Sequence, residues 1–181
     1  PAYSRSRRCE HGGSLMNIQL KPIDKDSVPR ALEKAERYRL LNEPLLAESI
    51  CLDILEIEST HQGALVCYVL ALAEQFTSAP EGALNRARAA VAKLESAYGR
   101  LYYDALLGER RGLAWLGQGG PGSRDAAWEH LTDAMELYER AHEIRPAHND
   151  DTTLRWNTCV RLIQRHRLRA PTRSEDDIPH E

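Results

Sequence analysis

A cluster of glycines near the middle of the chain is the feature best suited to phosphate binding. Gly117, Gly119, Gly120 and Gly122 lie directly before Ser123 and a predicted helix. Backbone amides at a helix N-terminus can hold a phosphate. A phosphate-binding loop, however, follows a strand and ends in Lys and then Ser or Thr, and residues 117–123 have neither feature. We therefore interpret the cluster as a turn between two helices and expect no cofactor.

The cysteines and histidines are too scattered to predict a metal site or a nucleophile. The cysteines are Cys9, Cys51, Cys67 and Cys159. They form no CxxC pair, and the last three fall in predicted helices, where buried thiols are common. The histidines form no i, i+4 pair; His142 and His148 flank Pro146, but zinc needs three or four ligands. No Ser or Cys has the context of a nucleophile, so we expect no catalytic residues and no enzyme.

Arginines are concentrated towards the C-terminus of the chain. They are Arg155, Arg161, Arg165, Arg167, Arg169 and Arg173. This run could bind RNA or another polyanion. Alternatively, cations near the end of a helix interact favourably with its dipole and keep that end soluble, and we favour this explanation. The whole chain carries 24 basic and 27 acidic residues, a net charge of −3, which also disfavours nucleic acid as the partner.

Length and composition indicate a helical protein of one domain or a short repeat array. The chain has 181 residues, of which 42% are hydrophobic, with a single Phe and few β-branched residues. Ala, Leu, Glu and Arg dominate, which favours helix, and no strand pattern bounded by turns is present. No apolar run is long enough to span a bilayer. We expect an all-α protein in the cytoplasm, with no membrane partner.

The most informative stretch is residues 134–146. Ala134, Tyr138 and Ala141 are spaced to lie on one stripe of a helix, and Pro146 follows its end. Small residues allow a neighbouring helix to approach closely, and the ring fills the groove beside them. Similar stripes recur elsewhere in the chain. They are Ala47, Cys51 and Ile54; Ala83, Ala87 and Ala90; and Ala127, Leu131 and Ala134.

Each stripe has a helix before it that could be its partner. Residues 28–58 predict one pair, with the turn at Asn42, Glu43 and Pro44. Residues 61–76 and a helix starting at the Ser78–Glu81 capping box predict a second pair. In the third pair, both helices gain about two turns, so we expect a hairpin of roughly 30 Å that protrudes from the array. A last helix runs from about Asp151 to Arg167 and carries Trp156 at a small-residue position, which suggests a capping helix.

This pattern resembles the tetratricopeptide repeat, a helix-turn-helix unit of about 34 residues. The resemblance covers roughly residues 28–166 and implies an α-solenoid of antiparallel helix pairs, a right-handed superhelix with about seven helices. We expect a poorly ordered N-terminal extension at residues 1–27, the repeat domain at residues 28–167, and a loose tail at residues 168–181. Met16 could be the natural start, which the sequence alone leaves open.

The resemblance also implies a function. In this family, the first helices of the repeats line a concave groove that holds peptide segments of partner proteins. The groove residues carried over are Glu36, Arg39, Val66, Leu70, Glu109, Arg110, Leu113 and Leu116. An apolar middle and charged margins suit an amphipathic or extended apolar segment. Alternatively, in so short an array, the apolar residues among them are core.

Members that bind chaperone tails use a clamp of Lys, Asn, Asn, Lys and Arg. The corresponding residues here are Leu32, Glu36, Cys67, Leu106 and Arg110, and only Arg110 matches. We therefore predict a non-enzymatic scaffold for another protein. The alternatives are polyanion binding through the C-terminal arginines and self-association, as a homo-oligomer, through the long third pair.

Overall fold

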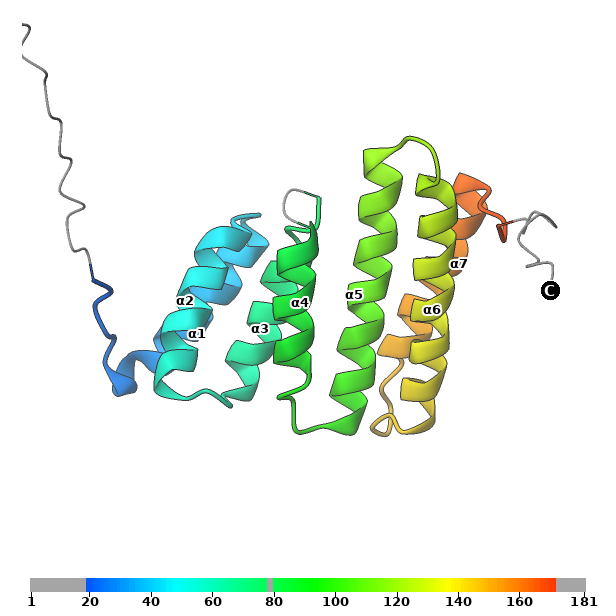
Figure 1. Cartoon of the computed structure of the whole chain (residues 1–181). Coiled ribbons are helices and arrows are strands. Elements are labelled where there is room, and N and C mark those ends of the chain that lie inside the picture. The colour runs from blue at the N-terminus through cyan, green and yellow to red at the C-terminus, as the bar shows by residue number, and fades with distance from the viewer. Residues whose placement is uncertain (1–18, 78–79, 172–181) are drawn as a thin grey trace, which may run out of the picture.

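The computed structural model describes residues 19–77 and 80–171, and within these ranges it contains no strand. The α-helices are α1 (Val28–Leu40), α2 (Pro44–Ile57), α3 (Gln62–Ala73), α4 (Pro80–Val91), α5 (Ala97–Gln118), α6 (Ser123–Glu143) and α7 (Asp151–His166), preceded by the short 3-10 helix η1 (Lys25–Ser27). Each α-helix packs against the next one along the chain, and consecutive helices run in opposite directions (Figure 1). This arrangement confirms the prediction of an α-solenoid of antiparallel helix pairs.

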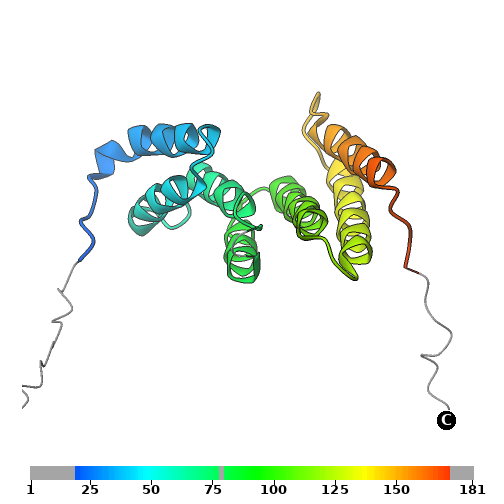
Figure 2. The same ribbon diagram turned by 90° about the horizontal axis from the view of Figure 1, so that it is seen from above.

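The helices follow an arc when the molecule is seen from above (Figure 2). Helices α1, α3, α5 and α7 lie along its inner side, and α2, α4 and α6 lie along its outer side. The first helix of each pair therefore lines the concave side.

Local chemistry at the ends of the helices explains where they start. The Ser96 hydroxyl accepts a hydrogen bond from Gly99 N at 3.1 Å, and the His61 imidazole accepts one from Ala64 N at 3.2 Å. Both satisfy amides that lack a partner in the first turn of a helix. Between α5 and α6, Gly119 and Gly122 have φ of 65° and 73°, a conformation that glycine adopts without strain. The glycine cluster is thus the turn that its sequence predicts.

The stripes of small residues are buried as expected. Ala134 and Ala141 are fully buried, and Tyr138 between them is 1% exposed. On α5, a methyl group added to Gly108 would lie 3.3 Å from Ala134 Cβ, and one added to Gly112 would lie 3.0 Å from Leu131 Cγ. The backbones of α5 and α6 therefore approach closely only because their contact residues are small.

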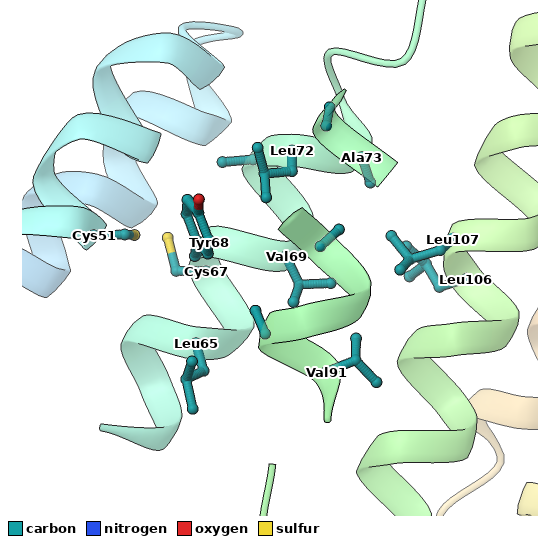
Figure 3. Close-up of a cluster of buried hydrophobic side chains, with 14 of the residues drawn as sticks. Cys51, Leu65, Cys67, Tyr68, Val69, Leu72, Ala73, Val91, Leu106 and Leu107 are labelled. Carbon is teal, nitrogen blue, oxygen red and sulfur yellow. The ribbon is translucent and has the colours of Figure 1, made fainter. Parts of the chain in front are cut away.

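Two hydrophobic clusters meet at α5. The larger cluster spans α1 to α5, and Figure 3 shows Leu106 and Leu107 of α5 beside Val69 of α3 within it. The second cluster spans α5, α6 and α7 and includes Ala105 and Cys159. Different residues of α5 thus pack in the two clusters, so this helix separates them.

The third helix pair is longer than the others. Helix α5 has 22 residues and α6 has 21, whereas α1, α2, α3 and α4 have 13, 14, 12 and 12. At a rise of about 1.5 Å per residue, α5 is roughly 33 Å long. Figure 1 shows α5 and α6 running past the ends of α3 and α4. The expected protruding hairpin is therefore present.

The structured region extends beyond the boundaries expected from the sequence at both ends. Ile23 packs against the cluster formed by Val28, Ile54 and Ala64. Leu168, expected to lie in the loose tail, is 6% exposed and packs in the second cluster, because the chain turns back after α7. Residues 1–18, 78–79 and 172–181, which include Cys9, Met16, Ser78 and Arg173, lie outside the described residues. None of the helices in the described ranges has both the length and the apolar character that crossing a membrane requires.

Candidate functional site

A hollow lies on the inner side of the arc, between three of the inner helices. It has a volume of about 480 Å³ and is formed by α3, the α4–α5 connection, α5 and the start of α7. Its lining residues are Gln62, Val66, Leu94, Glu95, Ser96, Tyr98, Gly99, Tyr102, Tyr103, Asn149 and Asp151. We call it the tyrosine hollow. Its volume is within the range of about 300–1,000 Å³ that is typical of ligand sites.

Three tyrosine rings of α5 form one wall of the tyrosine hollow. Tyr98 and Tyr102 are one helical turn apart and stack with 5.7 Å between ring centroids and 21° between planes. Tyr103 meets Tyr102 edge to face at 5.1 Å and 86°. All three side chains are partly exposed. Tyrosines offer a large, rigid surface with a polar tip, which is the combination favoured at protein interfaces.

Hydrogen bonds fix the floor of the hollow across distant parts of the chain. The Tyr98 hydroxyl lies 3.1 Å from Asn149 Oδ1, which also accepts from Asp151 N at 2.9 Å. On the other side, Glu95 N donates to Gln62 Oε1 at 3.0 Å. The starts of α3, α5 and α7 are therefore held side by side.

Burial and neighbouring charge raise the pKa of two tyrosines of the hollow, Tyr98 and Tyr103. Burial, followed by the charge of Asp151, raises the pKa of Tyr98 to about 12. Burial is also the main reason that the pKa of Tyr103 is raised, with Tyr102 and Asp151 adding to it. A phenol of ordinary pKa is already protonated at neutral pH, and the raised pKa extends this state to more alkaline pH.

An ion pair between α1 and α3 lies near the hollow. Arg39 Nε and Nη2 lie 3.1 Å and 3.0 Å from Glu74 Oε1, and both side chains are about one-fifth exposed. The charge of Arg39 acts on Tyr103, whose pKa it lowers slightly against the larger effect of burial. Arg39, predicted in the groove, thus belongs to the concave side but is already paired.

The predicted groove residues of the first two repeats divide into three environments. Val66 lines the tyrosine hollow. Leu70 is partly buried and packs against the larger cluster. Glu36 is exposed on α1.

Glu109, also predicted in the groove, is 1% exposed. Its Oε2 accepts from the Tyr138 hydroxyl at 2.9 Å, and its Oε1 accepts from Arg155 Nη1 at 3.1 Å. This carboxylate lies in the contact between α5, α6 and α7, because both of its hydrogen-bond donors are there. The structure therefore removes Glu109 from the groove residues.

The other predicted groove residues of α5 are Arg110, Leu113 and Leu116, which are all partly exposed. Gln62 and Tyr98 line the same hollow, so α3 and α5 begin side by side. Ala114, next to Leu113, packs in the larger cluster, so α5 is still in contact with the first two pairs at this height. Leu116 packs against the second cluster.

The predicted polyanion patch is also divided. Arg155 is partly buried in its ion pair with Glu109, so it is a structural residue. Arg161, Arg165, Arg167 and Arg169 are exposed. Arg167 and Arg169 line a second hollow of about 520 Å³ with Arg124 and Asp125 of α6. Arg124 also donates to the carbonyls of His166 and Arg167, which holds the end of α7 against α6.

The three described cysteines are free and buried. Cys51 of α2 and Cys67 of α3 lie next to each other (Figure 3), and a hydrogen bond between the thiols, followed by burial, raises the pKa of Cys51. Burial raises the pKa of Cys159 to about 12. Within residues 19–77 and 80–171, no group of three or more His, Cys, Asp and Glu side chains is placed to hold a metal ion.

Sequence reasoning missed Tyr98, Tyr102 and Tyr103. The available signal was three tyrosines within six residues, with i, i+4 spacing between the first two. Comparison with known proteins adds no further assignment, since no family, curated protein or solved structure matches the chain.

Proposed function

We propose that the chain is a non-enzymatic protein-interaction module of the tetratricopeptide type, which holds a segment of a partner protein in the tyrosine hollow. The observation that carries this proposal is the hollow itself, placed on the inner side of the arc and lined by Tyr98, Tyr102 and Tyr103. Binding there would bury aromatic surface that the free chain leaves partly exposed.

Hydrogen bonds order the hollow before a partner segment binds to it. The starts of α3, α5 and α7 are joined by the Tyr98–Asn149 and Glu95–Gln62 hydrogen bonds. A wall that is ordered before binding loses little conformational entropy on binding. The extended or helical segment of the partner would then contribute most of the ordering cost.

Peptide selection followed by NMR tests the proposal. Peptides selected on the immobilised protein should shift the amide resonances of Val66, Tyr98, Tyr103 and Asn149 when they are titrated into the labelled chain. Resonances of α2, α4 and α6 on the outer side serve as the internal control and should remain in place. Selection of no binding peptide, or shifts confined to the outer helices, would contradict the proposal.

A second candidate function rests on the exposed arginines at the end of α7. Arg124, Arg167 and Arg169 surround one hollow, which suits a phosphate-rich polyanion. Asp125 in the same hollow opposes this function, so we rank it second. Binding of a labelled single-stranded RNA should weaken steeply as salt rises, with a slope that grows with the number of phosphates contacted.

A further inference from the structure

The charge of the tyrosine hollow is of one sign. Among its lining residues, Glu95 and Asp151 are charged, and both are acidic. The remaining polar residues, Gln62, Ser96 and Asn149, are neutral. Within the described part of the chain, no Lys, Arg or His side chain lines this hollow. An occupant that carries a positive charge would therefore meet attraction from both ends of the hollow.

The two carboxylates are available to an occupant. Both residues are exposed. In the described chain, the Glu95 carboxylate takes part in no hydrogen bond or ion pair, although Arg100 is bonded to the backbone carbonyl of the same residue. Asp151 Oδ2 accepts a single side-chain hydrogen bond, from Asn149 Nδ2 at 3.2 Å.

The nearby cations are occupied elsewhere. Arg100 donates to the backbone carbonyls of Leu94 and Glu95. Arg39 is paired with Glu74, and Arg155 is paired with Glu109. The carbonyls leave the charge of Arg100 uncompensated, but none of the three guanidinium groups lines the hollow, and no ion pair is present at Glu95 or Asp151 in the described chain.

The tyrosine rings add a second attraction for a cation. An aromatic ring has a negative face, and a Lys or Arg group within about 6 Å of its centroid is attracted to it. Tyr98, Tyr102 and Tyr103 form a contiguous group of rings at the hollow, with centroids 5.7 Å and 5.1 Å apart. Arg also stacks flat on such rings and forms paired hydrogen bonds with a carboxylate.

The start of α7 could instead suggest an anion, because a helix N-terminus carries partial positive charge. Here that charge is already offset by Asp150 and Asp151, both at the start of α7. A phosphate or an acidic peptide in the hollow would face these carboxylates together with Glu95. The charges around the hollow therefore oppose an anionic occupant.

From these observations, and building on the proposed function, we propose that the hollow takes a basic segment of the partner protein. A Lys or Arg side chain of that segment lies on the tyrosine rings and pairs with Glu95 and Asp151. Val66, which is partly exposed, offers apolar contact to the residue beside it. The segment, rather than a free polyamine, is favoured because the hollow combines this apolar surface with hydrogen-bonding groups suited to a peptide backbone.

Synthetic nonapeptide libraries that differ only at a fixed central residue test the inference. The central residue is Arg, Lys, citrulline or Glu, of which citrulline has the shape of Arg without its charge. The Arg and Lys libraries should bind the full chain about tenfold more tightly than the citrulline library, with Glu weakest. Equal binding of the Arg and citrulline libraries would overturn the inference.

Charge-removing variants test whether the preference for Arg over citrulline depends on Glu95 and Asp151. The double variant Glu95→Gln/Asp151→Asn should lose the preference for Arg over citrulline. The control Glu56→Gln/Asp133→Asn changes the net charge equally at exposed positions on α2 and α6 and should retain it. An equal loss in both variants would show a non-specific effect of net charge and would overturn the inference.

Two further outcomes separate this inference from the proposed function. If peptides shift the resonances of the hollow but neutral ones bind as well as basic ones, the proposed function stands and the inference fails. If no peptide shifts those resonances, both fail. Spermidine is the remaining arm: binding of this free polyamine as tight as that of the Arg library would overturn the choice of a protein segment.

Discussion

Arg155 on α7 is paired with Glu109 on α5, with 3.1 Å between Nη1 and Oε1. The same carboxylate accepts a hydrogen bond from Tyr138 on α6 at 2.9 Å. The Glu109 side chain is 2% exposed, whereas that of Arg155 is 30% exposed. The buried Glu109 carboxylate therefore links α5, α6 and α7, and Arg155 is the cation that compensates its charge.

Removal of the compensating charge should destabilise the chain. Arg155→Met leaves the Glu109 carboxylate buried with only Tyr138 as a donor, which should cost about 3 kcal/mol of unfolding free energy, the lower end for a broken buried pair because Arg155 is partly exposed. Urea unfolding followed by circular dichroism measures the change. Arg161→Met, at an exposed position of the same helix, is the control. Equal stability of the two variants would contradict this account, and Glu109→Leu/Arg155→Met should recover much of the loss.

The close contact between α5 and α6 leaves no room at Ala134. This residue is fully buried and faces Gly108. Ala134→Trp should therefore overpack the contact and lower the unfolding free energy by about 1–3 kcal/mol. Glu136→Trp places the same ring on an exposed position of α6 and should change stability little. An unchanged melting temperature in the Ala134 variant would exclude the contact.

The buried thiols should resist alkylation in the native chain. The thiolate is the reactive species. Burial raises the pKa of Cys159 to about 12, and the hydrogen bond with Cys67, followed by burial, raises that of Cys51. The same hydrogen bond lowers the pKa of Cys67, so the slow reaction of this thiol depends on its burial. In a Cys9→Ser variant, a maleimide should modify these three cysteines slowly without denaturant and rapidly in urea. Mass spectrometry counts the added groups. Rapid modification of the native chain would show that the larger cluster or the second cluster opens readily.

Alkaline pH should weaken the fold partly through Tyr98. Its pKa is raised from 10.0 to about 12 in the folded chain, chiefly by burial and then by Asp151. Above pH 10 the unfolded chain releases this proton while the folded chain keeps it, so stability is complete below pH 10 and falls towards pH 12. Tyr98→Phe should flatten this fall in urea unfolding between pH 9 and 12. The lost hydrogen bond to Asn149 shifts stability equally at each pH, so an unchanged slope would contradict the prediction.

Sequence periodicity was sufficient to predict which helices pair, but not the register in which the paired helices pack along their axes. The stripe of Ala134, Tyr138 and Ala141 identifies the face of α6 that packs on α5, because that information is local. The small residues repeat by heptads along both long helices, so the stripe alone allows more than one register. The resemblance places the register at Gly112, whereas the hollow is formed by the turns around Tyr102, near the start of α5 at Ala97.

Contacts between residues that are far apart in the sequence produce no periodic pattern in it, so they were not predicted. Glu109 and Arg155 are 46 positions apart, and Tyr98 and Asn149 are 51 apart. Arg155 belongs to a run of similar residues in the sequence, so its burial depends on where α7 folds back against α5. The carboxylate that we expected in the groove and the arginine that we expected in the patch are each other's partners.

Tyr102 packs against both hydrophobic clusters and also lines the tyrosine hollow. In a solenoid, each unit is stabilised mainly by its neighbours, so the two sides of the array can open separately. An occupant placed on Tyr102 would stabilise a residue that both sides share. Amide hydrogen exchange should then slow in α3 and in α6 together, which would make two independently opening segments behave as one cooperative unit.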